Sequence, residues 1–413
     1  MRAASAVATS PAGSDTRLRI LHVAASYFPA VRYGGPIRSV HGLAAASVRR
    51  GHEVHVYTTN VDGDSLLDVP TDRPVDLDGV AVHYFPVPAL VPAKRLWWSP
   101  QLGRSLRDHV GSFDVVHIHA VFLWPMLAAA RAAARAGVPY VVAPRGMLIR
   151  DVIALKSRWV KMAWINLFER TTLARAAAVH VTAELEGAEL RALGLPARHI
   201  ANIANGVDWP REHSPLSAGP FARLPERYAL FLSRITEKKG LDRLIRAWQW
   251  VPDVPLVIAG NDEENYQPRL VELARSLGIA DRVLFVGPAG DADKWALYER
   301  AQLFVLASYS ENFGNVVAEA MSMGCPVVIT PEVGIAPLVT STGAGVVCDG
   351  APENFARAIN ELLRDPDRRR EMGRRGKEGA HAKLSWNGVA AEAEELYRYM
   401  VRGNVEPLGA VVS

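Results

Sequence analysis

The sequence predicts an α/β protein built from two doubly wound parallel sheets, the arrangement of two Rossmann-like domains facing a central cleft. Short apolar runs bounded by turn residues alternate with helical patterns along the whole chain, as in parallel sheets covered on both faces. The 413 residues exceed one ordinary domain and suit two of about 200 residues each. The alternation is interrupted once, at 209–226, where four prolines indicate a linker.

The individual strands follow from these apolar runs. In the first half of the chain, strands are predicted at 19–23, 53–57, 80–85, 114–119, 139–142, 178–182 and 199–203. In the second half they are predicted at 229–232, 255–259, 283–286, 303–306 and 326–329. Helices are expected between them, for example at 37–50, 241–250 and 315–323. Ligands of such sheets bind beyond the carboxyl ends of the strands, so functional residues are expected there.

The composition is that of a globular protein and excludes several other classes. Hydrophobic residues make up 49% and charged residues 22%, unlike a disordered or collagen-like chain. The apolar run at 120–130 is shorter than the roughly 20 residues that a spanning helix needs. Residues 1–16 lack the apolar core of a signal peptide and are expected to form a disordered tail. Two cysteines cannot form a disulfide framework, which fits a cytoplasmic protein.

The net charge of +4 is unevenly distributed along the chain. Residues 1–205 hold 23 Lys and Arg against 15 Asp and Glu, whereas the remainder holds 24 against 28. A basic first half and an acidic second half predict different binding partners for the two halves. Neither half has the dense basic tracts of a nucleic-acid-binding protein, so no nucleic-acid partner is expected.

The segment 308–320 carries the strongest chemical signal. It follows a predicted strand, places Gly314 at a turn and begins a helix near Asn315. Backbone N–H groups at such a helix start bind phosphate. Glu311 and Glu319 bracket this start, and we expect their carboxylates to accept hydrogen bonds from sugar hydroxyls on either side of a diphosphate. The alternative, two solvated glutamates, fits poorly with the apolar neighbours of Glu319.

Two loops offer further phosphate contacts. Arg234 and Lys239 follow the first strand of the second half and provide a planar fork and a point charge for phosphate oxygens. Alone, such a basic loop is as well explained by solvation, but the neighbouring glutamate segment favours phosphate binding. The Gly34–Gly35 pair lets backbone N–H groups approach a phosphate closely.

A His-x-His pair ends one of the predicted strands. His119 is expected at the strand tip, where ligand contacts concentrate, and His117 on the opposite side of the pleat or pointing into it. The pair suggests a metal, but no third ligand is expected near it, and no metal site is predicted. Asp-x-Asp pairs at 62/64, 76/78 and 291/293 are expected to be turn residues. No G-x-G-x-x-G motif follows the first strand, which argues against a nicotinamide or flavin cofactor.

Together these residues resemble the retaining glycosyltransferases of family 4, the group 1 transferases with the GT-B fold. The resemblance extends from Arg19 to about Met400. Its most specific element is an E-x7-E motif within SENFGNVVAEAMSMGCPVV. The R-x4-K pair at Arg234 and Lys239, the turn 205–208, the loop 33–35 and the strand-end histidine also match. The segment 329–336 departs slightly from the glycine-rich turn usual at that place.

The resemblance implies four catalytic residues. Glu311 and His119 would contact the transferred sugar, whereas Arg234 and Lys239 would bind the donor diphosphate. The cations and the helix start would stabilise the leaving group without a metal or other cofactor, and the departing phosphate would act as the base.

The donor site implied by the resemblance is larger. Glu319 would bind the ribose hydroxyls, Gly35 would lie against the phosphates and Gly287 would border the nucleobase pocket. The complete set is Gly34, Gly35, Asn205, Arg234, Lys239, Gly287, Glu311, Asn312, Phe313, Gly314, Asn315 and Glu319.

The same resemblance implies a division of the chain. We expect an acceptor-binding domain at 17–208, the linker at 209–226 and a donor-binding domain at 227–385. A helix at 386–402 would cross back to the first domain, and tails would lie at 1–16 and 403–413.

The expected function is transfer of a sugar from a nucleotide-sugar donor to a glycan or lipid-diphosphate-linked acceptor, in bacterial polysaccharide biosynthesis. One alternative is another enzyme on the same fold, such as a nucleotide-sugar 2-epimerase or a sugar phosphorylase. Another is a non-catalytic subunit that binds a sugar nucleotide.

A basic segment from 145 to 170 carries the expectation for the acceptor side. Apolar residues recur there at mostly three- or four-residue steps between six Lys and Arg, which predicts a basic amphipathic helix over part of the segment. We expect acceptor or membrane contacts from Arg145, Lys156, Trp159 and Lys161. Two alternatives remain: a core-facing helix with a solvated basic face, or a surface that docks on anionic lipid at the inner face of the cytoplasmic membrane.

Overall fold

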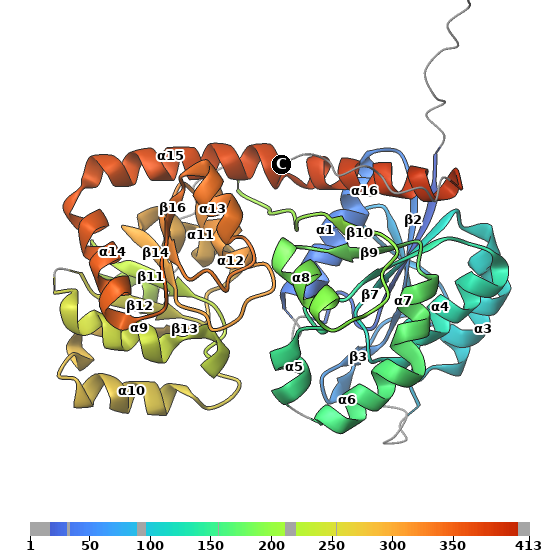
Figure 1. Cartoon of the computed structure of the whole chain (residues 1–413), viewed down its shortest axis with the longest axis horizontal. Coiled ribbons are helices and arrows are strands. Elements are labelled where there is room, and N and C mark those ends of the chain that lie inside the picture. The colour runs from blue at the N-terminus through green and yellow to red at the C-terminus, as the bar shows by residue number, and fades with distance from the viewer. Residues whose placement is uncertain are drawn as a thin grey trace, which may run out of the picture.

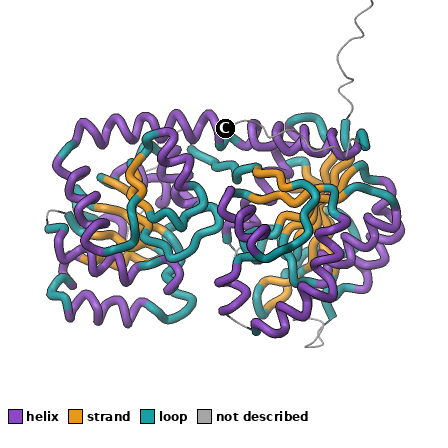
Figure 2. The backbone as a smooth tube through the Cα atoms, viewed as in Figure 1, coloured by secondary structure: helices purple, strands orange, loops and turns teal. Residues whose placement is uncertain are grey.

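The computed structural model describes residues 17–30, 34–88, 96–155, 157–210, 220–252 and 254–403. The predicted tail at 1–16, nearly all of the tail at 403–413 and half of the predicted linker lie outside these ranges. Two sheets lie side by side, one from each half of the chain (Figure 1). Figure 2 shows their strands enclosed by helices on both faces. The predicted fold class, two Rossmann-like parallel sheets, is therefore confirmed.

The first sheet has eight strands in the order β10-β9-β8-β7-β1-β2-β6-β5. Their bounds are β1 Arg19–Ala24, β2 Glu53–Thr59, β5 Val75–Leu77, β6 Val80–Phe85, β7 Val115–His119, β8 Tyr140–Ala143, β9 Ala178–Val181 and β10 Ile200–Asn202. All neighbours pair in parallel except β5, an antiparallel edge strand that the sequence did not predict. A separate small hairpin joins β3 Val61–Asp62 to β4 Ser65–Leu66.

The second sheet has six parallel strands in the order β13-β12-β11-β14-β15-β16. Their bounds are β11 Ala229–Leu232, β12 Leu256–Ala259, β13 Val283–Gly287, β14 Leu303–Leu306, β15 Val327–Ile329 and β16 Gly345–Val347. The short edge strand β16 was not predicted, because three residues give little periodicity to detect.

Helices cover both faces of each sheet. Those of the first half are α1 Gly35–Arg49, α3 Pro100–His109, α4 Trp124–Ala136, α5 Arg150–Leu155, α6 Arg158–Trp164, α7 Arg170–Arg175 and α8 Glu184–Ala192. Those of the second half are α9 Leu241–Ala247, α10 Gln267–Ser276, α11 Asp291–Arg300, α12 Asn315–Ser322, α13 Ala336–Thr342, α14 Pro352–Arg364, α15 Pro366–Lys383 and α16 Trp386–Val401. Within the described residues, no helix combines the length and apolar character that a membrane crossing requires.

Alternation along each strand sends its side chains into two separate cores. Leu21, Val116 and Ile118 pack with α3 and α4 on one face of the first sheet. Ile20 and Val115, one residue earlier in each strand, pack with α1 and α16 on the other face. This period of two decides which polar residues near the strand ends meet one another.

The last helix returns to the first sheet. Figure 1 shows α15 along the second half and α16 continuing over the first. The chain passes from one half to the other twice, after Val207 and again near Leu384, and these two crossings lie side by side. Val207 donates its N–H to the Leu384 carbonyl at 2.9 Å, and a β-bridge joins Val207 to Ser385. The Trp386 ring lies over Gly206 and Gly42, where an added Cβ would come within 2.4 Å of ring atoms.

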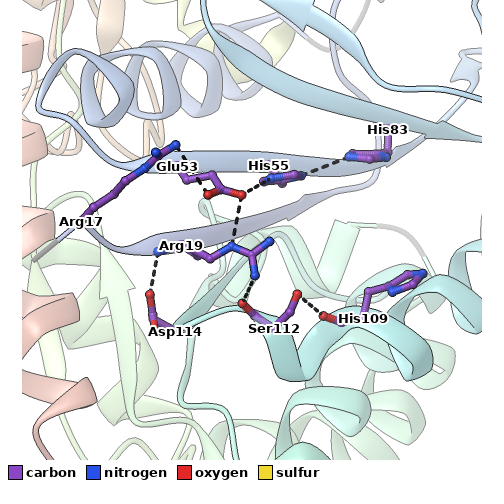
Figure 3. Close-up of polar contacts among 8 residues, drawn as sticks. All are labelled: Arg17, Arg19, Glu53, His55, His83, His109, Ser112 and Asp114. Carbon is purple, nitrogen blue, oxygen red and sulfur yellow. Dashed lines mark hydrogen bonds and ion pairs between the residues drawn. The ribbon is translucent and has the colours of Figure 1, made fainter.

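A polar cluster lies at the amino ends of the first sheet's strands (Figure 3). Arg19, the first residue of β1, donates from Nε to Glu53 Oε1 at 3.1 Å and from Nη1 to the Ser112 carbonyl at 2.6 Å. Glu53 also contacts His55 at 3.1 Å, whose ring stacks on His83. Hydrogen bonds from His55 and Arg19 outweigh partial burial and lower the pKa of Glu53.

The prediction that the Asp-x-Asp pairs lie in turns is correct for some of these aspartates and wrong for others. Asp78, at positive φ, does lie in the turn between β5 and β6, where the Gly79 N–H donates to Asp76 Oδ1 at 3.1 Å. Asp291 and Asp293 instead begin α11. Acidic residues are favoured at helix starts by the helix dipole, which explains this position as well as a turn would.

A candidate nucleotide-sugar site between the two sheets

The loop between β14 and α12 is held in one conformation by its neighbours. Gly314 precedes the helix at φ 98°, and a Cβ there would lie 2.7 Å from a methyl of Val333. Glu311 donates its N–H to the Glu332 carbonyl, and its own carbonyl accepts from Gly334 at 2.9 Å. Phe313 is buried in the core, so its side chain anchors the loop. The first N–H groups of α12 are therefore presented from a fixed position.

Glu311 and Lys239 form an ion pair beside this helix start. The Lys239 ammonium donates to Glu311 Oε2, and both side chains are at least four-fifths buried. Burial acts to raise the pKa of Glu311, but the positive charges of Lys239, Lys238 and Arg234 outweigh it and lower the pKa. Glu311 is therefore ionised at neutral pH. Arg234 is more open, with its side chain 58% exposed and Nη1 3.8 Å from Glu263.

Glu319 is already hydrogen-bonded by two side chains of α11. Lys294 Nζ lies 2.9 Å from Glu319 Oε1, and the Tyr298 hydroxyl donates to Oε2 at 3.1 Å. Lys294 and Tyr298 are four residues apart on one face of α11. Their spacing was visible in the sequence, but their proximity to Glu319 depends on how α11 packs against α12, so sequence reasoning missed them.

The start of α1 faces the start of α12. A Cβ on Gly35 would lie 2.9 Å from the Nδ2 atom of Asn315, so a larger residue there would displace the Asn315 side chain. Gly34 precedes α1 at φ 63°. Gly287 ends β13 at φ 78°, and a Cβ added to it would meet no atom within 4 Å, so the space beside it is open. The glycine loop at Gly35 thus lies against the start of α12.

Two asparagines of the predicted donor set join the halves of the chain. Asn205 donates from Nδ2 to Asn315 Oδ1 at 3.0 Å and accepts from Arg145 Nη1 at 2.8 Å. Asn312 donates to Thr182 Oγ1 at 2.8 Å and to Glu186 Oε2 at 3.2 Å. The Asn312 side chain therefore bonds the first half of the chain in this structure. Thr182 and Glu186 were not found from the sequence.

Histidines from three strands meet at the carboxyl ends of the first sheet, which corrects the prediction for His117. His117 and His119 are two residues apart and lie on the same side of the pleat, with ring centroids 4.1 Å apart. His22 of β1 stacks on His119, and His180 of β9 contacts His117. The period of two requires this arrangement, whereas the expected opposite placement would need an odd spacing.

One chain of hydrogen bonds begins at a backbone carbonyl, which can only accept. His180 Nε2 therefore donates to the Ile203 carbonyl at 2.8 Å, leaving His180 Nδ1 as the acceptor for His117 Nε2 at 3.2 Å. His117 Nδ1 then accepts from the Tyr397 hydroxyl of α16 at 2.7 Å. Burial lowers the pKa of His180 to about 3 and places the pKa of His117 well below its usual value, so both rings are neutral.

A second chain begins at a guanidinium, which can only donate. Arg145 Nη2 donates to His119 Nδ1 at 3.1 Å, and His119 Nε2 then donates to His22 Nδ1 at 2.8 Å. The remaining His22 Nε2 is buried and has no partner in the described part of the chain. Burial also lowers the pKa of His22 to about 3. Both ring nitrogens of His119 are thus occupied by protein groups.

His22, His117 and His119 have the geometry of a metal site, with ligand atoms within 4.8 Å of one another. The expectation that no third ligand lies near the pair is therefore wrong. The two hydrogen-bond chains, however, use the lone pairs of all three rings, and the Arg145 charge lies beside them. These residues do not fit a metal ion without breaking several of their hydrogen bonds.

The basic segment is helical over part of its length, as predicted. It forms α5, α6, a π-helical turn at Ile165–Glu169 and α7. Trp159 is 84% exposed on α6, while Ile153 and Ile165 are buried. Lys161 donates to the Val152 carbonyl at 2.6 Å. Arg145 lies apart from these helices, in the cleft, and Lys156 lies outside the described residues.

Known families and proteins resemble the chain over nearly its whole length. The family described as Glycosyl transferase 4-like domain matches residues 34–206, and Glycosyl transferases group 1 matches residues 218–379. The uncharacterized glycosyltransferase MJ1607 of Methanocaldococcus jannaschii is 26% identical, over 92% of this chain and 98% of that protein.

Two relatives with named activities match shorter stretches. D-inositol 3-phosphate glycosyltransferase of Salinispora tropica is 35% identical over 42% of this chain and 39% of its own length. The GDP-mannose:cellobiosyl-diphosphopolyprenol alpha-mannosyltransferase of Xanthomonas campestris is 30% identical over 59% of this chain and 62% of its own length.

Solved structures share the fold at lower identity. Sucrose-phosphate synthase of Thermosynechococcus elongatus has a TM-score of 0.73 at 22% identity, covering 94% of this chain and 100% of that one. Anabaena HepE in complex with UDP-glucose has a TM-score of 0.69 at 20% identity, covering 94% of this chain and 100% of that one. With both family matches and the paired sheets, these findings establish that the chain belongs to the retaining group 1 glycosyltransferases of family 4, GT-B enzymes that transfer a sugar from a nucleotide-sugar donor.

Proposed function

We propose that the protein is a metal-independent hexosyltransferase that acts on a glycan or lipid-diphosphate-linked acceptor in bacterial polysaccharide biosynthesis. The observation that carries this proposal is the buried Glu311–Lys239 pair beside the start of α12, opposite the start of α1. The Xanthomonas relative, whose name states a diphosphopolyprenol acceptor, supports the choice of acceptor class.

The chemistry follows from the charge that develops on the leaving nucleoside diphosphate. In our proposal Arg234, Lys239 and the first N–H groups of α12 balance that charge. Glu311 stays ionised beside Lys239 and accepts a hydrogen bond from a hydroxyl of the transferred sugar. The departing phosphate takes the proton of the attacking acceptor hydroxyl, so no protein base is required.

A donor panel tests this proposal directly. Full-length protein is incubated with UDP-, GDP- and ADP-hexoses, and thermal shift reports binding, because a ligand at 100 times its Kd adds about 2.7 kcal/mol of stability. The preferred donor should release nucleoside diphosphate, and NMR of the product should show a retained anomeric configuration. Activity should survive EDTA. A complete loss on chelation that manganese restores would overturn metal independence.

The rival functions give different outcomes in the same assay. Product formed from the donor sugar without any acceptor would favour an epimerase, and phosphate-dependent release of a sugar phosphate would favour a phosphorylase. Binding without any turnover across acceptor preparations would favour a non-catalytic subunit.

Peripheral membrane contact forms a second part of the proposal. Trp159, Val160 and Leu167 are 84%, 67% and 68% exposed, and Arg158 and Lys161 lie beside Trp159 in the chain. Exposed aromatic and aliphatic side chains among cations suit the headgroup region of an anionic bilayer, where each basic residue contributes about 1 kcal/mol.

Vesicle sedimentation tests this contact. The protein should sediment with anionic vesicles at low salt and dissociate as salt rises. Replacing Lys156, Arg158 and Lys161 by Glu should abolish sedimentation, and Trp159→Ala should weaken it. Trp250→Ala, which replaces an exposed tryptophan of the second half, serves as the control and should have no effect. No sedimentation at low ionic strength would contradict the proposal and favour a soluble acceptor.

A further inference from the structure

A cavity of about 300 Å³ opens beside the histidine cluster, on the first sheet's side of the cleft. It lies between the end of β1, the start of α1 and the loop after β7. Its lining is mainly apolar and includes Ile37, Trp97, Leu123 and Met147. Arg145 is the one charged residue among the described residues that line it.

The charge of Arg145 is not balanced by a carboxylate. Its hydrogen-bond acceptors, His119 Nδ1 and Asn205 Oδ1, are both neutral, and it forms no ion pair among the described residues. Its Nε atom is buried and has no partner within the same part of the chain. Burial lowers the pKa of Arg145 to about 10, with Glu186 acting in the opposite direction, so the guanidinium remains charged at neutral pH.

Glu186 is not available as a counter-ion at contact distance. Its Oε1 accepts from the Gly146 N–H at 2.6 Å, and its Oε2 accepts from the Thr182 N–H at 2.9 Å and from Asn312. These bonds hold the carboxylate toward the segments that follow β8 and β9 and toward the β14–α12 loop. A partly buried cation that lacks a paired anion is costly, and such an arrangement is sustained where a ligand supplies the missing charge.

We propose that the acceptor carries an anionic group, a phosphate or a carboxylate, that binds Arg145 in this cavity. A guanidinium has five N–H donors, of which two are used by His119 and Asn205, so others remain for an anion. The apolar lining and Trp97 suit the face of a sugar ring attached to that group. This inference rests on the proposed function, in which the second sheet binds the donor.

The donor diphosphate is the other possible source of the anion. Asn205 connects Arg145 to Asn315 at the start of α12, where the donor phosphates are proposed to bind. The position of the cavity favours the acceptor, because its described lining comes entirely from the first half of the chain. The experiment therefore has one arm for each source.

The first arm measures nucleotide binding by calorimetry, using UDP and GDP with wild type, Arg145→Gln and Arg145→Lys. The second arm saturates the protein with the better nucleoside diphosphate and titrates glucose 6-phosphate, glucuronate and neutral glucose. Wild type should bind the anionic probes at least about tenfold more tightly than glucose, as expected for a charged hydrogen bond. Arg145→Gln should lose this preference, while its nucleotide affinity should change less than about threefold.

Two further variants serve as a conservative replacement and as a control. Arg145→Lys preserves the charge without the planar fork and should retain part of the preference. Arg150→Gln replaces an exposed arginine at the start of α5 and should behave as wild type. Thermal unfolding and circular dichroism confirm that each variant is folded at the assay temperature.

Each contrary outcome has a distinct meaning. An equal affinity of wild type for glucose and the anionic probes, or an anion preference that survives Arg145→Gln, would overturn the inference. Loss of nucleotide affinity in Arg145→Gln with the anion preference intact would assign Arg145 to the donor and also overturn it. If wild type binds no nucleoside diphosphate at all, the proposed function itself fails.

Discussion

Arg19 and Arg145 lie at opposite ends of the same sheet, and their surroundings differ in one respect. At the amino ends, Arg19 is paired with Glu53 and remains partly open to solvent (Figure 3). At the carboxyl ends, Arg145 contacts a neutral histidine and a neutral asparagine. The charge of Arg19 is balanced by a carboxylate of the protein, whereas the charge of Arg145 is left for a ligand to balance. The comparison separates charges that serve stability from charges that serve a ligand.

The largest expected effect is a loss of turnover on substitution of Glu311, a charged residue at the proposed ligand site. Glu311→Gln should lower turnover by about 100-fold or more, because it removes the carboxylate proposed to orient the transferred sugar. Affinity for the nucleoside diphosphate should change only a few-fold. Steady-state kinetics and calorimetry measure the two quantities. Glu53→Gln, the corresponding change at the amino ends, should leave turnover unaltered, and wild-type turnover in Glu311→Gln would disprove its role.

A smaller effect is expected at the two donor-phosphate cations. Arg234→Ala and Lys239→Ala should each cost about 1.5–3 kcal/mol of donor binding or transition-state stabilisation, the range for charged hydrogen bonds. The double variant should lose less than the sum, because both cations bind one diphosphate. Donor titrations of the four proteins give the coupling.

Arg275→Ala provides the control, since its side chain is 66% exposed and paired with the similarly exposed Glu272. Additive losses below about 0.5 kcal/mol each would show that the loop is merely solvated.

The histidine cluster predicts a dependence of stability on pH. The pKa values of His22 and His180 are about 3 in the folded protein, below the value of about 6.5 for an unfolded chain. The unfolded state therefore binds more protons below pH 6.5, and stability falls as pH falls from 6.5 toward 3. The loss is about 2 kcal/mol per histidine at pH 5.

Urea unfolding at pH 7, 6 and 5 measures this slope. His22→Asn, which keeps an acceptor in place of Nδ1, should reduce the slope by one proton. Val116→Ala, a non-titrating change in the same sheet, should lower stability equally at each pH. An unchanged slope in His22→Asn would mean that His22 is not buried as a neutral ring.

The smallest effect is expected at the amino-end pair. A double-mutant cycle of Arg19→Ala and Glu53→Gln should give a coupling of about 1 kcal/mol or less that weakens with salt. Both side chains are partly exposed, at 42% and 30%, so water competes with the pair. A coupling of several kcal/mol would show that the Arg19–Glu53 pair is not weakened by solvent, which would contradict this prediction.

The sequence predicted those parts of the site that are local in the chain. Glu311, Gly314 and Asn315 occur within one loop and helix start, and their mutual positions follow from that short connection. The glycine loop at Gly35 was predicted to face the same cleft because strand ends converge there, and the structure brings it within contact of Asn315.

The histidine network depends on contacts between distant segments and was not predicted. His22 contacts His119 across 97 residues, and His117 contacts Tyr397 across 280. Strand order and the packing of α16 create these contacts, and neither is encoded in a local pattern. The placement of His117, by contrast, was within reach, because residues two apart on a strand share a face.

The paired crossings of the chain limit how the two halves can move. Val207 and Leu384 join the crossings by a hydrogen bond, and the Trp386 ring lies over Gly206 beside it. Because the two crossings are hydrogen-bonded to each other, a change in the relative position of the two halves has to bend both crossings at the same place. Away from the crossings, Asn312 bonds Thr182 and Glu186 between the two halves. A bulky residue at Gly206 would clash with the Trp386 ring and would force the two crossings apart.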